Sequence, residues 1–208
     1  DRLIARDAKV CVVLRAQVKQ PENNDFVETL VHLADAFREL MLGIVWDVRM
    51  EKVWGHREWR DRVMGEPFSV LNHVAVRVLP AEGGLKTHRL RTRGLRKFGS
   101  PDLVVGSVPP DMVDDVTGLL RDIAENLTGG ELLGPDETID YGIGKLRLVA
   151  SPPLDAGEGE LLALADEPAE GSDAVPDAKA GIPELMAAMK KDRQEMEGKR
   201  AGGGQGAQ

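Results

Sequence analysis

Cysteine, aromatic residues and long apolar runs are all scarce in this sequence of 208 residues. The single cysteine, Cys11, excludes an internal disulfide and any metal site built from several thiolates. Aromatic residues make up only 4% of the chain, and no apolar run approaches the roughly 18 residues that a membrane-spanning helix needs. The chain begins at Asp1 without a basic and apolar leader, so we expect a reducing, cytoplasmic location and no membrane partner.

The residues that are present fit a globular protein. Hydrophobic residues make up 42% of the chain and charged residues 30%, which excludes a fully disordered or collagen-like protein. The net charge of −8 argues at face value against nucleic-acid binding. The charge is unevenly distributed, however, with 18 basic and 13 acidic residues in 1–97, 3 and 10 in 98–150, and 6 and 12 in 151–208. The net charge therefore does not exclude binding to anionic partners.

The composition changes along the chain and predicts four parts. Residues 1–150 are expected to form one α+β domain, and 151–182, rich in Pro, Gly, Ala and acid, an acidic linker. Leu161, Leu162 and Leu164 form an apolar island in that linker, which could dock as an edge strand or a turn of helix. Residues 183–198 are expected to form an amphipathic helix, and 199–208 a flexible tail.

Hydrophobic periodicity within residues 1–150 predicts the order of helices and strands. The fold class is a two-layer α+β sandwich, ferredoxin-like in the broad sense, with an antiparallel or mixed sheet and two helices on one face. Cys11 is expected to be buried in the first strand. Trp46, Trp54 and Trp59 are expected to pack in the core, and the alternative is that they line a shared hydrophobic pocket or interface. The predicted strands are 8–16, 44–50, 70–79, 85–92, 102–105, 138–141 and 145–150, and the main helices are 26–41 and 110–127, with a short interrupted helix in 51–64.

The most distinctive motif is a corner between two predicted strands. Glycine permits a positive φ, and proline holds the residue before it extended, so the segment suits a tight turn. Leu95 and Phe98 would plug this turn into the core. We interpret the motif as structural rather than as a ligand-binding loop. Its residues are Thr92, Gly94, Leu95, Phe98, Gly99, Pro101, Asp102 and Leu103.

This motif, T-x-G-L-x-x-F-G-x-P-D-L, resembles that of a group of uncharacterised bacterial domains. The resemblance spans residues 8–150 and excludes the tail. It implies a fold, but the family's function is unknown, and some related small domains are suspected of interaction or immunity roles beside bacterial toxins. This chain departs from the pattern in being basic at the variable positions, with Arg93, Arg96 and Lys97.

The sharpest functional signal is a basic strip between residues 86 and 97. If 85–92 is a strand, Arg89, Arg91 and Arg93 project to one face, and Lys86, His88 and Leu90 to the other. An arginine row on a solvent face could grip phosphates or carboxylates, although a solvated outer face is the simpler interpretation. The acidic linker is itself a candidate counter-charge. The strip comprises Lys86, His88, Arg89, Arg91, Arg93, Arg96 and Lys97.

The predicted C-terminal helix offers a second binding surface. Soft methionine faces suit adaptable contacts with a groove on a partner. The residues of this face are Leu185, Met186, Met189 and Met196. The sequence therefore predicts a non-catalytic protein-interaction module that uses both the basic strip and this helix.

Signals for catalysis are weak. Histidines 56, 73 and 88 match no local metal-ligand spacing, so we predict no metal, no cofactor and no catalytic residue. The alternative function is a small-anion-binding protein or enzyme that uses His88 with its neighbouring arginines. Nucleic-acid binding ranks third. The sequence identifies neither the protein partner nor the oligomeric state.

Overall fold

The structure is a computed structural model that describes residues 8–17, 23–65, 67–80, 86–126, 134–142, 144–153, 161–166 and 181–202, with side chains up to residue 196. The chain divides into two compact units. One comprises 1–76, 92–102 and 120–132, and the other 77–91, 103–119 and 133–208. The α+β class predicted from the sequence is confirmed.

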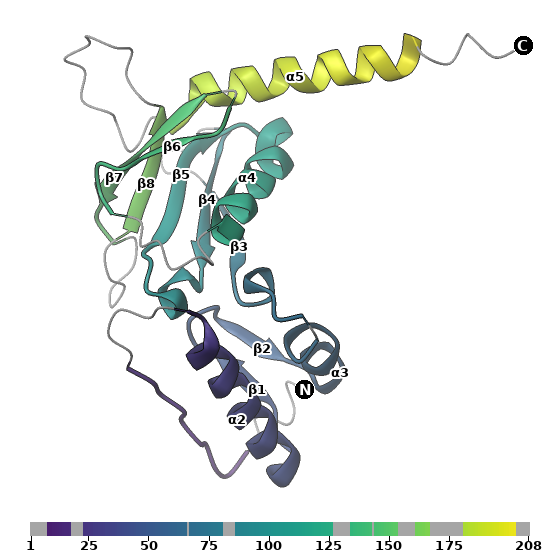
Figure 1. Cartoon of the computed structure of the whole chain (residues 1–208), viewed down its shortest axis with the longest axis vertical. Helices are drawn as coiled ribbons and strands as arrows, with labels where there is room; N and C mark the ends of the chain where they lie inside the picture. The colour runs from purple at the N-terminus through teal and green to yellow at the C-terminus, as the bar shows by residue number, and fades with distance from the viewer. Residues whose placement is uncertain are drawn as a thin grey trace, which may run out of the picture. The chain divides into compact units, whose positions relative to one another are not determined.

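The first unit is built from a long helix and a small two-stranded sheet (Figure 1). Helix α2 (Asp25–Met41) has acidic residues in its first turn and ends where Leu42 adopts a left-handed backbone with φ 50°. Strands β1 (Val45–Asp47) and β2 (Lys52–Trp54) pair antiparallel, with Val45 opposite Trp54. Two short helices follow, α3 (His56–Glu58) and the π-helical η1 (Trp59–Val63), and later the 3₁₀ turns η2 (Val70–Asn72) and η4 (Leu95–Phe98).

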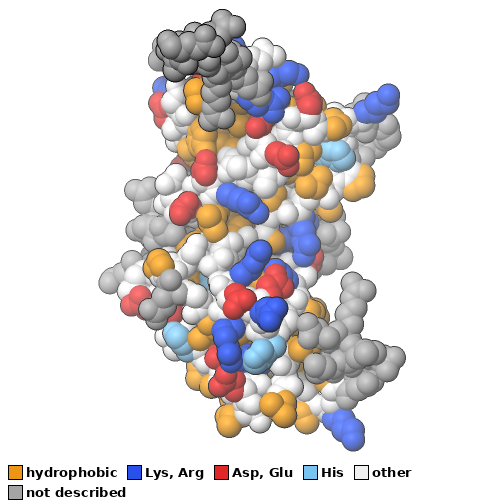
Figure 2. Space-filling model, turned by 90° about the vertical axis from the view of Figure 1, so that its right-hand side faces the viewer, with side chains coloured by type: hydrophobic (Ala, Val, Ile, Leu, Met, Phe, Trp, Pro, Cys, Tyr) orange, Lys and Arg blue, Asp and Glu red, His pale blue; other side chains and the backbone are white. Residues whose placement is uncertain are grey.

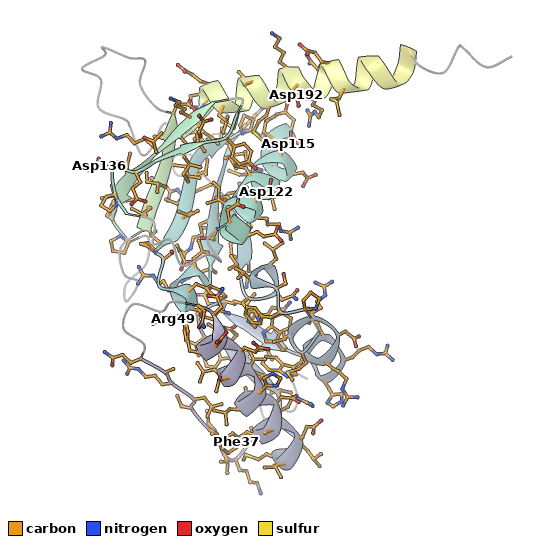
Figure 3. The ribbon with its side chains drawn as sticks, in the orientation of Figure 1. Phe37, Arg49, Asp115, Asp122, Asp136 and Asp192 are labelled. Carbon is orange, nitrogen blue, oxygen red and sulfur yellow. The ribbon has the colours of Figure 1, made fainter. Side chains whose placement is uncertain are left out.

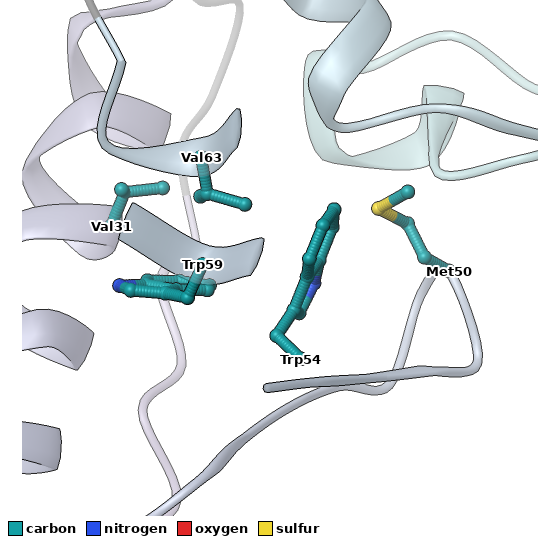
Figure 4. Packing of buried hydrophobic residues seen from close by; sticks show 5 residues of the cluster. All are labelled: Val31, Met50, Trp54, Trp59 and Val63. Atoms are coloured by element: carbon teal, nitrogen blue, oxygen red, sulfur yellow. The ribbon is translucent and has the colours of Figure 1, made fainter. Parts of the chain in front are cut away.

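The core of this unit is a cluster of buried apolar side chains from α2, the β1–β2 hairpin and η1 (Figure 4). The rings of Trp54 and Trp59 meet edge to face, with centroids 6.2 Å apart. Core packing is thus confirmed for these two tryptophans, whereas Trp46 is exposed, contrary to expectation. The cluster comprises Val31, Met50, Trp54, Trp59 and Val63.

The second unit contains most of a mixed six-stranded sheet, in the order β3-β4-β5-β8-β7-β6. Helix α4 (Val113–Asn126) follows the 3₁₀ turn η5 (Pro110–Met112), carries a buried apolar stripe and is divided between the two units at residue 119. The C-terminal helix α5 spans Pro183–Gly202. The strands are β3 (Ala75–Pro80), β4 (His88–Arg93), β5 (Asp102–Val108), β6 (Thr138–Asp140), β7 (Lys145–Ser151) and β8 (Leu161–Asp166).

Strand β8 corrects the predicted linker. It lies between β5 and β7, and its five residues from Leu161 to Ala165 are all buried. Its register with β7 runs from Ser151 opposite Leu161 to Leu146 opposite Asp166. A strand that is buried on both faces has a continuous apolar sequence rather than an alternating one. The sequence LLALA therefore fits the centre of the sheet better than an edge. Residues 154–160 and 167–180 of the predicted linker lie outside the described residues.

The predicted first strand is a second correction. Residues 8–17 have no secondary structure and are exposed throughout, and Cys11 is exposed rather than buried. High β-propensity describes a fit to a half-buried pleated surface, and here no strand of the described residues pairs with the segment. The predicted end of the C-terminal helix at Gly198 is also wrong, because α5 continues to Gly202.

Candidate functional site

The basic strip does not form the exposed arginine row that its sequence suggests. Strand β4 lies between β3 and β5, and both Leu90 and Arg91 are buried, although they point to opposite faces of the strand. Only 2% of Arg91 is exposed. The expectation that Arg89, Arg91 and Arg93 share a solvent face is therefore wrong for its central member.

Two further cations of the strip, Arg93 and Lys97, are paired within the first unit. Nη2 of Arg93 donates to Oε1 of Glu51. Nζ of Lys97 lies 2.6 Å from Oδ2 of Asp47. Figure 2 shows the same mixture on the face that it draws, where Lys and Arg side chains lie next to Asp and Glu side chains rather than in one basic band.

Arg96 has its Nε 3.9 Å from a carboxylate oxygen of Asp102. With Arg91 buried and Arg93, Arg96 and Lys97 near carboxylates, four of the strip's six lysines and arginines are neutralised or out of reach. Glu51, Asp47 and Asp102, the carboxylates beside Arg93, Lys97 and Arg96, all lie in the first unit. His88 and Arg89 are half-buried, and Lys86 is exposed.

The corner motif is organised around one buried carboxylate. Oδ1 of Asp102 accepts a hydrogen bond of 3.0 Å from the backbone N–H of Leu95 and lies 3.4 Å from Oγ1 of Thr92. Leu95 and Phe98 are buried, as expected for the plug of the corner. Gly94 has φ 115°, a conformation that side chains rarely adopt. These contacts favour the structural interpretation of the motif.

The rest of the motif completes this turn. Gly99 adopts φ 86° at the end of η4, Pro101 is half-buried at the start of β5, and Leu103 is fully buried in that strand.

A buried histidine lies beside this corner. Burial, and secondly the nearby Lys97 ammonium, lower the pKa of His73 to about 4, with Asp47 acting in the opposite direction. The imidazole stacks on Phe68, with ring centroids 4.9 Å apart, and makes a T-shaped contact with Phe98, with ring centroids 6.4 Å apart. Burial also lowers the pKa of Lys97, against the opposing effect of Asp47. At neutral pH His73 is therefore an uncharged core side chain.

His73 makes the stability of the protein sensitive to acid. In the unfolded chain its pKa returns to 6.5, so between pH 6.5 and about 4 the unfolded state binds more protons than the folded state. The contribution of His73 to the free energy of unfolding is thus fully present above pH 6.5. It falls by about 2 to 3 kcal/mol as the pH drops to about 4. Urea unfolding at pH 7 and pH 4 measures the loss, and H73F, which keeps the ring stack, is expected to remove it.

The matched control for this measurement is H32Q, since His32 is exposed on α2. This variant is expected to keep the acid dependence of the native chain. An acid dependence that H73F leaves unchanged would show that other groups cause it.

The predicted methionine face of the C-terminal helix is largely covered by its own unit. Leu185 and Met186 are buried, whereas Met189 is half-buried and Met196 exposed. The carboxylate of Asp166, at the end of β8, caps the helix by accepting from the backbone N–H groups of Glu184 at 2.7 Å and Leu185 at 3.1 Å. The first turn of this helix is therefore a packing element, and its Leu185 and Met186 are not available to a partner.

Two ion pairs hold the next turns of α5. Nζ of Lys190 lies 2.8 Å from Asp111, and Nη1 of Arg193 lies 2.8 Å from Asp115. Figure 3 labels Asp115 on α4, close to the helix it binds. The Lys190 ammonium, by hydrogen bond and charge, lowers the pKa of Asp111. Asp111 of η5 and Asp115 in the first turn of α4 thus act as counter-charges for α5.

Exposed apolar side chains are concentrated in one part of the described chain. Among the described residues fourteen large hydrophobic side chains are exposed, and twelve of them lie between Val10 and Val53. They belong to the segment 8–17, to α2 and its C-terminal end, and to the β1–β2 hairpin. These side chains are Val10, Val12, Val13, Leu14, Leu33, Phe37, Leu40, Met41, Leu42, Trp46, Val48 and Val53.

A sequence signal for part of this surface exists. Helix α2 has more apolar positions than one buried stripe needs, because Val27, Val31 and Ala34 already face its core. The surplus positions follow a separate 4-3-4-3 spacing, which is the pattern of a second, helix-pairing stripe. They are Phe26, Leu30, Leu33, Phe37 and Leu40.

The described residues contain no group of three or more His, Cys, Asp or Glu side chains that could hold a metal ion. Nor does any helix in the described part of the chain have the length and apolar character to cross a membrane. Comparison of the chain with protein-family models, curated proteins and solved structures finds no match, so the resemblance carried by residues 92–103 stays a prediction.

Proposed function

We propose that the protein is a non-catalytic interaction module that binds another protein through the apolar surface of residues 10–53. The observation that carries the proposal is the concentration of twelve of the fourteen exposed large hydrophobic side chains in this part of the chain. Monomeric proteins rarely leave large contiguous apolar patches in water, and such patches mark interaction sites. A bacterial, cytoplasmic setting belongs to the same proposal.

The outer face of the β1–β2 hairpin is the strongest element of this surface. Trp46 and Val53 are directly opposite in the register, so they share one face of the hairpin, and both are exposed. The neighbouring pair, Val45 and Trp54, points to the other face, where Trp54 is buried in the core. A rigid hairpin that presents tryptophan outward offers the kind of anchor that dominates binding energy at protein interfaces.

The basic strip has a smaller role in this proposal than the sequence suggests. Its buried or paired arginines and lysine cannot grip an anion without breaking contacts inside the domain. Small-anion binding around His88 and nucleic-acid binding are therefore less well supported. Lys86, exposed at the end of the strip, and Met189 and Met196 on α5 remain available as secondary contacts.

Site-specific photo-crosslinking tests the proposal. A photoreactive residue at Val53, which is 44% exposed, is compared with the same residue at Val78, which is 47% exposed but lies outside the apolar surface. In an extract of the source organism, Val53 is expected to yield a discrete protein adduct that Val78 does not. W46K is expected to weaken that adduct, because it places a charge beside position 53 on the same face.

An adduct that forms equally at both positions would mean non-specific contact. The absence of any adduct at Val53, in a variant that folds normally, would refute the proposed surface.

A further inference from the structure

We propose that helix α2 pairs with α2 of a second copy of this chain, antiparallel, through the stripe Phe26, Leu30, Leu33, Phe37 and Leu40. This inference goes beyond the proposed function. It assigns Leu33, Phe37 and Leu40 of the apolar surface to a second copy of the chain and leaves the hairpin face, with Trp46 and Val53, to the partner protein. The photo-crosslinking at Val53 and the experiment below test the two separately.

The stripe lies on a face of α2 that its own unit leaves uncovered. Leu33, Phe37 and Leu40 are exposed, with Leu40 at 82%, and Phe26 and Leu30 are half-buried. Residues spaced by four and three positions form one nearly straight seam along a helix, which is the geometry that packs against another helix. The stripe itself contains no charged residue.

The order of the side chains makes the stripe complementary to itself. In an antiparallel pair centred on Leu33, Leu33 meets Leu33 of the second copy. Phe26 then faces Leu40 of the second copy, and Leu30 faces its Phe37, so each phenylalanine has a leucine opposite. Such self-complementarity is what a two-fold symmetric contact requires. A contact with an unrelated partner would not need this arrangement.

The residues beside the stripe also allow two α2 helices to pack closely. Thr29 and Ala36 are exposed small residues beside it, and small side chains let two helices come close together. Arg38, the one basic residue of the last turn, faces inward, where Asp35 accepts its hydrogen bonds. In the antiparallel pair, the acidic first turn of one helix, with Asp25 and Glu28, lies beside the C-terminal end of the other helix. The two helix dipoles therefore point in opposite directions.

The available area fits a weak, reversible dimer. The stripe and its flanks expose on the order of 500 Å² per copy, so two copies would bury about 1,000 Å², the lower limit for a specific interface. The exposed segment 8–17 is the rival occupant, because it is apolar and flanked by Lys9 and Arg15, but its own side chains are exposed as well.

Cysteine crosslinking at the two-fold centre tests the pairing. In a C11S background, which removes the native thiol, L33C is expected to form a disulfide-linked dimer under mild oxidation. H32C in the same background is the matched control, because His32 is also exposed and adjacent but lies off the stripe. Sedimentation of the unmodified chain is expected to show a concentration-dependent shift from 22.6 kDa towards twice that mass.

The L33E variant is expected to abolish this shift, because it places two carboxylates face to face. Since Leu33 is exposed, L33E keeps the fold, and its thermal unfolding serves as the check. A chain that stays monomeric up to about 1 mM overturns the proposal. So does a dimer that L33E leaves intact, or equal crosslinking by H32C and L33C. When L33C is made without C11S, an intramolecular disulfide between Cys11 and the introduced thiol would assign the stripe to segment 8–17 instead.

Discussion

Replacing Gly94 by alanine is expected to lower the free energy of unfolding by about 3 to 5 kcal/mol. Gly94 has φ 115°, and a Cβ there would collide with the carbonyl oxygen of His73 and lie 3.2 Å from Cγ of Met50. The carbonyl is backbone, so it cannot rotate away as a side chain would. The corner would have to open, which would expose Leu95 and loosen the contact of its N–H with Asp102. Urea denaturation measures the loss.

The control for G94A separates backbone strain from collision. Gly142 also has a positive φ, of 76°, but a Cβ there would meet nothing within 4 Å. G142A is therefore expected to cost only about 1 kcal/mol, the penalty of the left-handed conformation. If both variants lose the same stability, the close packing of Gly94 against His73 is not what holds the corner.

The second large effect is expected from D35A, at about 3 to 5 kcal/mol. The side chain of Arg38 is only 3% exposed, and Oδ1 of Asp35 accepts from its Nε at 2.9 Å and its Nη2 at 2.7 Å. The same oxygen accepts from Nε1 of Trp59 at 2.9 Å. Removing this one carboxylate therefore leaves a buried cation and a buried indole N–H without their shared acceptor. Urea unfolding followed by circular dichroism measures the change.

Glu39 provides the matched control. Its carboxylate lies 3.2 Å from the same Nη2 of Arg38, but its side chain is 56% exposed, so E39A is expected to cost less than about 1 kcal/mol. The double variant D35L/R38M is expected to be more stable than D35A, since no unpaired charge is left in the interior. Equal losses in D35A and E39A would show that burial does not distinguish the two carboxylates.

The sequence patterns correctly predicted those parts of the fold that depend mainly on residues close together in the sequence. The apolar spacing of residues 26–41 and 113–126 marks helices whose buried faces are visible in the sequence, and β6 and β7 lie within a residue of their predicted bounds. The plug formed by Leu95 and Phe98 followed from turn chemistry alone.

The errors arose where the environment is set by distant residues. Segment 8–16 has strong β-propensity, but propensity does not supply a neighbouring strand. Residues 161–166 lie in a polar, glycine-rich part of the sequence, yet they pair with β5 on one side and with β7 on the other. In each case the deciding partner lies elsewhere in the chain.

The same reason explains the basic strip. Its cations look unpaired in the sequence because Glu51 and Asp47 lie 42 and 50 residues before Arg93 and Lys97. The burial of Arg91 depends on the position of β4 inside the sheet, which no local pattern reveals. The second stripe of α2, by contrast, was readable as a surplus of apolar positions.

The central position of β8 has a consequence for the order in which the protein is made. During synthesis β3, β4 and β5 leave the ribosome first, and β6 and β7 follow, but the strand between these groups is the last of the six to emerge. Until Asp166 has emerged, β5 and β7 each have an unpaired edge, and such edges invite pairing with other chains. From the emergence of Ser151 until that of Asp166, the nascent protein therefore carries two incomplete halves of one sheet.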